Sequence, residues 1–316
     1  VGSHHREILR SYLNNSRVML LLTLTHAMVL PADVVRVAEV AARQAASVVR
    51  AKLGADVLQT KASRGDLLTE VDGEVQRIIE AHVQEAFPTH AFLGEESVAA
   101  GSKASAEALQ EAMAMQDGEW LWICDPIDGT TNFVQSLPLV GISIGVAHRT
   151  GETGWELAAG VIMDPFRDEC FSATRGDGAL LNGHPISCDR SALCDAVVAT
   201  GFAPNEASLR PMVRGIAAVG ARCRTVRMLG SAAIMLAWVA SGRLSAYFEA
   251  DLNAWDTAAG VLLVREAGGV VTDLEGRSWE IATRPLIACN GVAHAELQVC
   301  LAEAGVVGLD DLSDGA

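Results

Sequence analysis

The order of apolar segments changes once along the chain, near Asp195, and this change limits the possible folds more than any other feature. Before it, short apolar runs bounded by glycine, proline or acidic residues follow one another and predict strands. After it, strand-like runs alternate with segments of helical periodicity, which is typical of an α/β layer. We therefore expect helices over a mostly antiparallel sheet in the first half and a second α/β layer in the other.

The individual elements follow from this pattern. Strands are predicted over 91–93, 120–124, 140–147, 157–163, 169–173, 197–200, 223–228, 244–248, 270–272 and 286–289. Helices are predicted over 31–49, 71–86, 206–219, 231–241, 256–267 and 292–304. The segment 102–115, rich in alanine and glutamate, predicts an inserted surface helix, and glycines at 176, 178 and 183 predict turns.

We find no repeat, heptad pattern or proline-rich linker, so residues 31–316 are expected to form one domain of two packed halves, about 31–190 and 191–305. A site is expected where the halves meet. Residues 1–30 stay unassigned. An apolar run over 18–32 after three arginines fits a targeting segment, and the first residue, Val1, fits a fragment equally well.

The charge balance limits the partners. The chain has 24 Lys+Arg and 39 Asp+Glu, a net charge of −15, and half of its residues are hydrophobic. This composition disfavours disorder, and it disfavours nucleic acid or an anionic membrane as partner. The longest uncharged runs, 18–32 and 228–242, are too short to cross a bilayer. Seven cysteines without a CxxC pair predict reduced thiols and a cytoplasmic location, or an organelle such as a plastid if residues 1–30 are a transit segment.

The strongest chemical signal is the segment Asp125-Pro-Ile-Asp-Gly-Thr-Thr-Asn132, which follows an apolar strand. Two carboxylates on one turn, with the Ile127 carbonyl exposed between them, form a pocket of hard oxygen atoms suited to Mg²⁺. The amides that follow Gly129 open a predicted helix and suit a phosphate group. Helix capping would explain one aspartate but not both.

Other segments are ambiguous on their own. Glu95 and Glu96 follow a predicted strand, where a solvated turn is the simpler explanation. Asp256 opens a predicted helix and fits an N-cap, and the small residues after Gly230 fit tight packing. Glu249 ends a strand seven residues before Asp256, so both could face one cavity; a solvated strand end is the alternative.

Together, these segments resemble the motifs of the inositol monophosphatases. Gly94-Glu-Glu-Ser97, the Asp125 segment, Gly230-Ser-Ala-Ala233 and Trp255-Asp256 occur in that family's order and approximate spacing, and the resemblance covers about residues 34–305. It implies an α+β or α/β fold arranged as the layered αβαβα sandwich shared with fructose-1,6-bisphosphatases, and a homodimer. It also implies Mg²⁺-dependent, Li⁺-sensitive hydrolysis of inositol monophosphate to myo-inositol and phosphate, a reaction of inositol metabolism and phosphatidylinositol signalling.

The resemblance assigns metal ligands and catalytic groups by position. Glu95, Asp125 and the Ile127 carbonyl would hold a first Mg²⁺, and Asp125, Asp128 and Asp256 a second. Glu95 would help to hold a third. Asp125, Glu95 and Thr130 would be catalytic, with Thr130 and Glu95 orienting and deprotonating the attacking water.

The resemblance also assigns substrate contacts and supporting residues. The amides of Gly129 and Thr130 would bind phosphate, and the inositol ring would meet Gly230, Ser231, Ala232 and Glu249. The metal-binding residues Glu95, Ile127, Asp128 and Asp256 would also face the substrate. The supporting positions are Lys61, Asp72 and Glu96; for Lys61 and Asp72 a structural salt bridge is the alternative.

Alternatives remain open. The stretch between Glu96 and Asp125 is longer than usual in the family and carries the insert at 98–118, so the mouth of the site is expected to differ. Thr131 and Asn132 favour an inositol monophosphatase over nucleotide or histidinol phosphatases. A sugar phosphatase and a non-catalytic binding module are further alternatives. No histidine lies in the motifs, which disfavours a zinc hydrolase, and no P-loop motif is present.

Overall fold

The computed structural model describes residues 29–60, 67–115, 119–151, 154–202, 206–306 and 308. The helices are α2 (Pro31–Ala51), α3 (Glu70–Ala86), α4 (Ser102–Ala114), α5 (Thr130–Val134), α6 (Glu206–Gly220), α7 (Ala232–Ala240), α8 (Ala254–Glu266) and α9 (His294–Glu303), with short 3-10 turns η1 (Glu95–Ser97) and η2 (Leu193–Asp195).

The strands form three sheets. The largest holds β3 (Ala91–Gly94), β4 (Trp120–Asp128), β5 (Gly141–Thr150), β6 (Gly154–Asp164), β7 (Glu169–Thr174), β8 (Gly178–Leu181) and β9 (His184–Ile186), in that order. The second has the order β11 (Thr225–Arg227), β10 (Val197–Thr200), β12 (Ala246–Glu249), β14 (Leu286–Cys289) and β13 (Val270–Thr272). The third pairs β1 (Val57–Thr60) with β2 (Leu67–Thr69).

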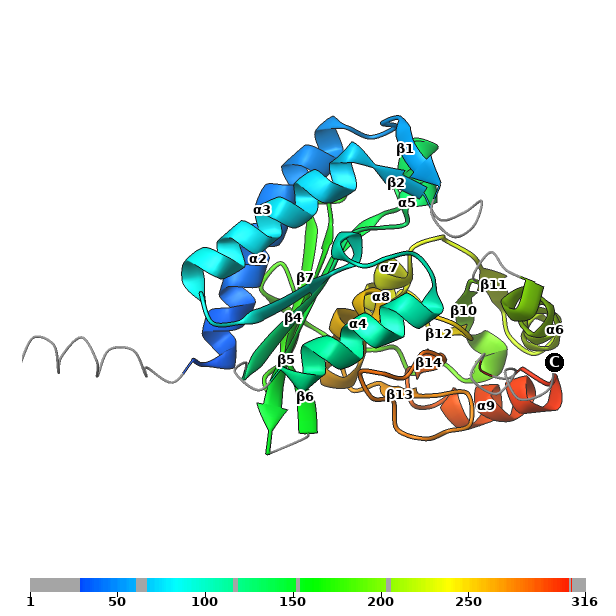
Figure 1. Cartoon of the computed structure of the whole chain (residues 1–316). Helices are drawn as coiled ribbons and strands as arrows, with labels where there is room; N and C mark the ends of the chain where they lie inside the picture. Colours follow the sequence, from blue (N-terminus) through cyan, green and yellow to red (C-terminus); the bar gives the residue numbers. More distant parts are fainter. Residues whose placement is uncertain are drawn as a thin grey trace, which may run out of the picture.

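The two larger sheets and the helices form five layers (Figure 1). Helices α2 and α3 pack on the outer face of the seven-stranded sheet, α7 and α8 lie between the sheets, and α6 and α9 pack on the five-stranded sheet. Both α7 and α8 are buried on almost every side, because both of their faces meet a sheet. This arrangement confirms the predicted αβαβα sandwich.

The strand directions match the predicted difference between the halves. Every neighbouring pair in the seven-stranded sheet is antiparallel except β3 with β4. In the five-stranded sheet, β10 is parallel to both β11 and β12, whereas β14 is antiparallel to β12 and β13. The second layer is therefore a mixed sheet, with parallel pairing confined to one edge.

Some elements were not predicted as strands. The turn region at 176–183 contains β8 and the two-residue loop of the β8–β9 hairpin, in which Asn182 and Gly183 have φ of 49° and 79°. Positive φ at both positions is what a type I′ turn requires. The β1–β2 pair was also missed, because its strands are three to four residues long and lack clear apolar alternation.

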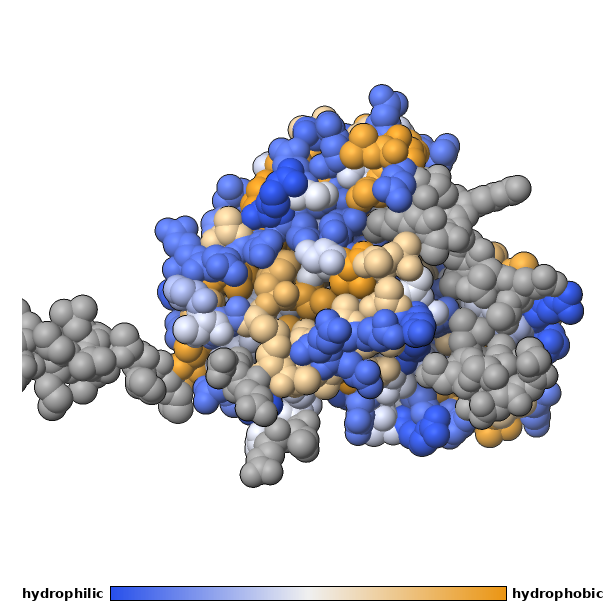
Figure 2. Space-filling model, in the orientation of Figure 1, coloured by the Kyte–Doolittle hydropathy of each residue, from blue (hydrophilic) through white to orange (hydrophobic). Residues whose placement is uncertain are grey.

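The inserted segment forms α4, a surface helix as predicted. Leu109 and Ala112 are buried against the larger sheet beside β3, while Figure 2 shows hydrophilic residues along the outward side of α4. In the described part of the chain, no helix is both long enough and apolar enough to span a bilayer. All seven cysteines are free thiols. The division into two halves at about residue 190 stays a prediction.

Candidate metal centre

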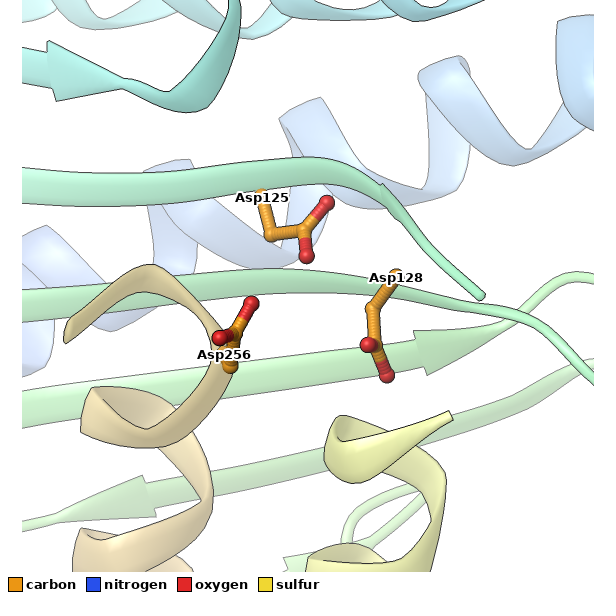
Figure 3. Close-up of side chains that lie close together, drawn as sticks. All are labelled: Asp125, Asp128 and Asp256. Atoms are coloured by element: carbon orange, nitrogen blue, oxygen red, sulfur yellow. The ribbon is translucent and has the colours of Figure 1, made fainter. Parts of the chain in front are cut away.

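Three aspartates come together where β4 meets the first turn of α8. Asp125 and Asp128 lie on β4 and Asp256 on α8, and each offers a carboxylate oxygen within 4.8 Å of those of the other two. Figure 3 shows the three carboxylates around a common space. The side chains of Asp125 and Asp128 are 2% and 8% exposed. The three residues predicted to hold a second metal are thus brought together from positions up to 131 apart in the sequence (256 − 125).

A bulge in β4 places both of its aspartates on one side. Asp125 pairs with Ser143 and Asp128 with Gly141, so three steps along β4 oppose two along β5. Residues three apart in a regular strand face opposite sides, and the extra residue restores the same side. The predicted rigid turn is therefore a bulge at a strand end. The amide of Ile127 donates to Asp125 Oδ1 at 3.0 Å and stabilises it.

Asp256 is the third residue of α8 rather than its N-cap. The helix begins at Ala254, two residues earlier than predicted, and Asn253 caps it. Asp256 Oδ2 accepts the amide hydrogen of Asn253 at 2.6 Å, as in a capping box. Arg284 stabilises this start by donating to Asp251 Oδ1 at 2.7 Å and to Asn253 Oδ1 at 3.0 Å. One oxygen of Asp256 is thereby used for the cap.

Asp128 is oriented by the first turn of α7. The Ser231 hydroxyl and the Ala233 amide both donate to Asp128 Oδ2, the latter at 2.7 Å. Ser231 Oγ also accepts the amide hydrogen of Ile234 at 3.3 Å and so caps α7. Ser231, which the resemblance assigns to the inositol ring, therefore holds a carboxylate of the aspartate cluster in place in this structure.

The electrostatics of the cluster favour a cation. Burial, followed by the charges of the neighbouring carboxylates, raises the pKa of Asp125 and Asp256 well above the usual range. Burial also raises the pKa of Asp128 to about 6, although its hydrogen bonds to Ser231, Ala233 and Ala232 oppose the shift. Buried like charges at this distance destabilise one another unless a cation lies between them. The donor atoms are all carboxylate oxygens, so the residues present fit Mg²⁺.

Glu95 acts on the cluster from η1. Its charge contributes to the raised pKa of Asp125, Asp128 and Asp256, but it is not one of the residues whose oxygens lie within 4.8 Å of one another. Its half-buried side chain lies next to Glu96, the predicted supporting residue.

Gln76 positions η1, and sequence reasoning missed it. Its side chain is 6% exposed, accepts the Glu96 amide hydrogen at 2.9 Å and donates to Ser97 Oγ at 2.8 Å. The position of Gln76 on α3 is the sequence signal that would have identified it. Gln76 follows Val75 and precedes Ile79 on the buried face of that helix, where a polar residue calls for a partner.

Gly129 and Thr130 lie directly after the bulge. Gly129 has a φ of 95°, and a Cβ there would stand 2.8 Å from the Gly230 carbonyl oxygen. Only glycine fits both the conformation and this close approach. Thr130 begins α5 as predicted, and its hydroxyl donates to the Ile127 carbonyl oxygen at 3.1 Å.

Asn132 connects the segment that follows α5 with the segment that precedes α7. Its side-chain amide donates to the carbonyl oxygens of Leu139 at 2.8 Å and Leu229 at 2.7 Å. The predicted phosphate-binding residues of α5 and the predicted ring-binding residues 230–232 therefore lie side by side. Asn132 is a positioning residue that the motif contained without an assigned role.

Glu249 is buried rather than a solvated strand end. It is 7% exposed and accepts a hydrogen bond from Tyr247 Oη at 2.6 Å. A Cβ on Gly201 would lie 2.4 Å from Glu249 Oε2, so that glycine makes room for the carboxyl group. Burial raises the pKa of Glu249 to about 8, and its charge in turn contributes to the raised pKa of Asp256. It is therefore within electrostatic reach of the metal cluster.

Asp72 caps α3. It is 1% exposed, and its Oδ2 accepts the Thr69 amide hydrogen at 2.8 Å and the Thr69 hydroxyl at 2.5 Å. Burial is the main cause of its raised pKa, and the charge of Glu95 adds to it. The other predicted supporting residue, Lys61, lies outside the described residues. Asp72 is thus near η1, with a capping role of its own.

The segment Gly141-Ile-Ser-Ile-Gly145 matches the GxSxG pattern of serine hydrolases, but its geometry does not. Ser143 is fully buried in the middle of β5 and donates to the Trp255 carbonyl oxygen at 2.9 Å. A nucleophile elbow requires an exposed serine on a sharp turn between strand and helix. Ser143 instead ties β5 to the start of α8.

Comparison with known proteins agrees with this geometry. A model of the inositol monophosphatase family matches residues 31–305. An inositol-1-monophosphatase of Synechocystis is 37% identical over 78% of this chain and 80% of its own length, and a Nus factor SuhB of Pasteurella multocida is 36% identical over 74% and 81%. The solved inositol monophosphatase of Anabaena superposes with a TM-score of 0.70 at 31% identity, covering 86% of this chain and 95% of that one.

These matches support a phosphatase, that is, a phosphoric monoester hydrolase, and the family is in general metal-dependent. The family model spans all three aspartates of the cluster. The chain belongs to the inositol monophosphatase family.

Proposed function

We propose that this chain hydrolyses inositol monophosphate to myo-inositol and phosphate with the help of bound Mg²⁺. The observation that carries the proposal is the cluster of Asp125, Asp128 and Asp256, whose oxygens lie within 4.8 Å of one another. The name of the Synechocystis relative supports the substrate. The SuhB name of a relative at similar identity leaves room for another role.

Acidic side chains and one backbone carbonyl group would bind the metal. Asp125, Asp128 and Asp256 would hold Mg²⁺, with Glu95 and the Ile127 carbonyl oxygen as further ligands at the same edge of the sheet. Bound Mg²⁺ would neutralise the phosphoryl oxygens and lower the pKa of a bound water. Two to three ions are proposed on the resemblance.

Other groups would orient the substrate and the water. The Thr130 hydroxyl lies beside the proposed Ile127 ligand and would orient the attacking water together with Glu95. The amides of Gly129 and Thr130 would bind phosphate oxygens. The Glu249 carboxyl group is buried and held by Tyr247, and it would accept hydrogen bonds from ring hydroxyls.

A panel of phosphate-release assays tests the proposal. We expect inositol 1-phosphate to be preferred over fructose 1,6-bisphosphate, 3′-phosphoadenosine 5′-phosphate and histidinol phosphate. Activity should vanish with chelator, return with Mg²⁺ and decrease with Li⁺. Full activity of metal-stripped protein would overturn the metal role, and preference for another substrate would keep the reaction while changing its assignment.

Variants of Glu249 and Thr130 test the two remaining roles. Glu249→Gln should lower kcat/KM for inositol 1-phosphate and largely spare an aryl phosphate without hydroxyl groups. Equal losses on both substrates would place Glu249 with the metal site instead. Thr130→Ala should lower kcat at unchanged Mg²⁺ affinity, because it removes a hydroxyl but no ligand charge.

We also propose a homodimer, on the resemblance alone, and a cytoplasmic location, on the seven cysteines without a CxxC pair. Light scattering after size-exclusion chromatography would test the dimer, and fractionation of the source cells would test the location.

A further inference from the structure

We propose that a second pocket, at the other end of α8 from the metal centre, binds a small organic anion with a planar apolar body. The pocket has a volume of about 400 Å³. Its walls include Met113 from the end of α4, Trp155 and Leu157 from β6, and Arg265 from the last turn of α8. This site does not depend on the proposed function.

The pocket is separate from the metal centre. Asp256 and Arg265 are nine residues apart on α8, which places them about 13 Å apart along the helix axis. In Figure 1, one end of α4 lies beside the ends of β5 and β6, where Trp155 of β6 donates to the Met113 carbonyl oxygen. The insert therefore helps to build this second pocket, in addition to any effect on the mouth of the first.

Arg265 supplies a positive charge that no carboxylate of the described residues pairs with. Its guanidinium donates to the Trp279 carbonyl oxygen at 2.7 Å and lies 5.9 Å from the centre of that ring. Burial, followed by the charge of Arg175, lowers its pKa. Within the described ranges, no carboxylate forms an ion pair with Arg265, whose remaining N–H donors are available to a ligand.

Two carboxylates near Arg265 have other roles, and a third, the exposed Glu280, also lines the pocket without an ion pair to Arg265 among the described residues. Glu266 accepts the amide hydrogens of Gly176 and Gly178, each at 2.9 Å. Glu156, on the exposed rim, pairs with Arg175 at 3.1 Å. A partly buried guanidinium without a carboxylate is unfavourable unless an anion joins it. A carboxylate, sulfonate or phosphate group of a ligand would supply that anion in a forked geometry.

The apolar wall is held in place before any ligand binds. Trp155 Nε1 donates to the Met113 carbonyl oxygen at 3.1 Å, and Arg149 donates to the same oxygen at 3.2 Å. The Arg149 guanidinium also lies 4.8 Å from the centre of the Trp155 ring. These contacts fix the end of α4 against β6, so that little ordering accompanies binding.

Charge and size together define the ligand class. A volume of about 400 Å³ accommodates a small molecule of one or two rings. The net charge of −15 disfavours a ligand with several negative charges. A single anionic group for Arg265 and a flat apolar body for Trp155 and Leu157 fit both limits.

Calorimetric titration of the full chain with 1-naphthoate tests this assignment. Chelator in the buffer removes metal, so that the metal centre does not retain the probe. We expect one site per chain, and binding at least about tenfold weaker for Arg265→Gln and for the neutral probe 1-naphthamide. Trp155→Leu should also weaken binding, through the apolar wall.

Controls separate the site from general effects of charge and folding. Arg222→Gln removes one positive charge from a surface pair with Glu303 and should leave binding unchanged. Arg265→Lys keeps the charge and should bind more tightly than Arg265→Gln. If Arg265→Gln does not fold, the comparison of naphthoate with naphthamide on the unchanged chain tests the need for a charge. No binding, equal binding of naphthoate and naphthamide, or unchanged affinity in the Arg265 and Trp155 variants would each overturn the proposal.

Discussion

Helices α3 and α8 begin in the same way and serve different purposes. Each carries an aspartate as its third residue, Asp72 in α3 and Asp256 in α8. Asp72 accepts the amide hydrogen of Thr69 at 2.8 Å and Asp256 that of Asn253 at 2.6 Å. The local geometry of the two helix starts is therefore nearly the same.

The neighbours of the two aspartates differ. Asp72 also accepts the hydroxyl of Thr69 at 2.5 Å, and its hydrogen bonds oppose the rise of its pKa. Asp256 faces Asp125 and Asp128, and after burial it is the charge of Asp128 that raises its pKa most. A capping aspartate joins a candidate metal centre where tertiary packing places other carboxylates opposite it.

The largest expected effect is the loss of turnover in Asp256→Asn. This variant removes one ligand charge from the cluster, so phosphate release in the presence of Mg²⁺ should decrease by more than about 100-fold. Its melting temperature without metal should stay close to that of the wild type, because an asparagine oxygen can still accept the Asn253 amide hydrogen. The matched control Asp72→Asn should retain activity within a fewfold. Similar losses of turnover in Asp256→Asn and Asp72→Asn would contradict the proposed difference between the two aspartates.

The converse variant is Asp72→Ala. It removes a buried acceptor from the amide and hydroxyl of Thr69, so the free energy of unfolding should decrease by about 2 kcal/mol. Urea denaturation measures this loss, and the Mg²⁺ dependence of the activity should stay unchanged. A weaker Mg²⁺ affinity in the folded variant would show instead that Asp72 supports the metal site, as the family resemblance suggests.

A third helix start extends the comparison, because Ser231, the N-cap of α7, contacts a carboxylate of the cluster directly. Ser231→Ala removes the hydroxyl that donates to Asp128. The Mg²⁺ concentration for half-maximal activity should rise about tenfold, since residues that orient ligands typically contribute this much. A change only in KM for the substrate would assign Ser231 to the inositol ring.

The smallest expected effect lies just beyond the C-terminal end of α3. His90 is buried, stacks on Phe87 with ring centroids 4.5 Å apart, and accepts a hydrogen bond from Trp122 Nε1 through Nδ1 at 3.0 Å. Burial, and then the charge of His148, lowers its pKa to about 4. Protonation therefore favours the unfolded state.

The stability that neutral His90 contributes is complete above the unfolded pKa of about 6.5 and is lost as the pH falls towards 4. Between about pH 7 and pH 5.5, this residue should account for about 1 kcal/mol of the change in unfolding free energy. His90→Gln, which keeps an acceptor for Trp122, should flatten the pH dependence by that amount. An unchanged dependence would contradict the assignment.

Local pattern was enough to predict most elements and the three aspartates that the structure brings together. Apolar runs and helical periodicity predicted ten of the strands and the main helices, because burial on one face or both leaves a periodic trace. The segment from Asp125 to Asn132 predicted hard-oxygen chemistry, since two carboxylates so close together have little structural use. Short strands such as β1 and β2 show no comparable apolar pattern in the sequence.

What supports the site could not be predicted from local pattern. The sequence by itself determined which residue types can bind Mg²⁺ and, through glycine and proline, where the backbone bends. Only the tertiary structure decided that a bulge turns Asp128 to the side of Asp125, that α7 holds Asp128, and that Gln76 anchors η1. The second pocket likewise joins α4, β6 and α8. These contacts join residues that are far apart in the chain. Hydrogen bonds and charges depend on distance in space, and the spacing of residues in the sequence does not give that distance.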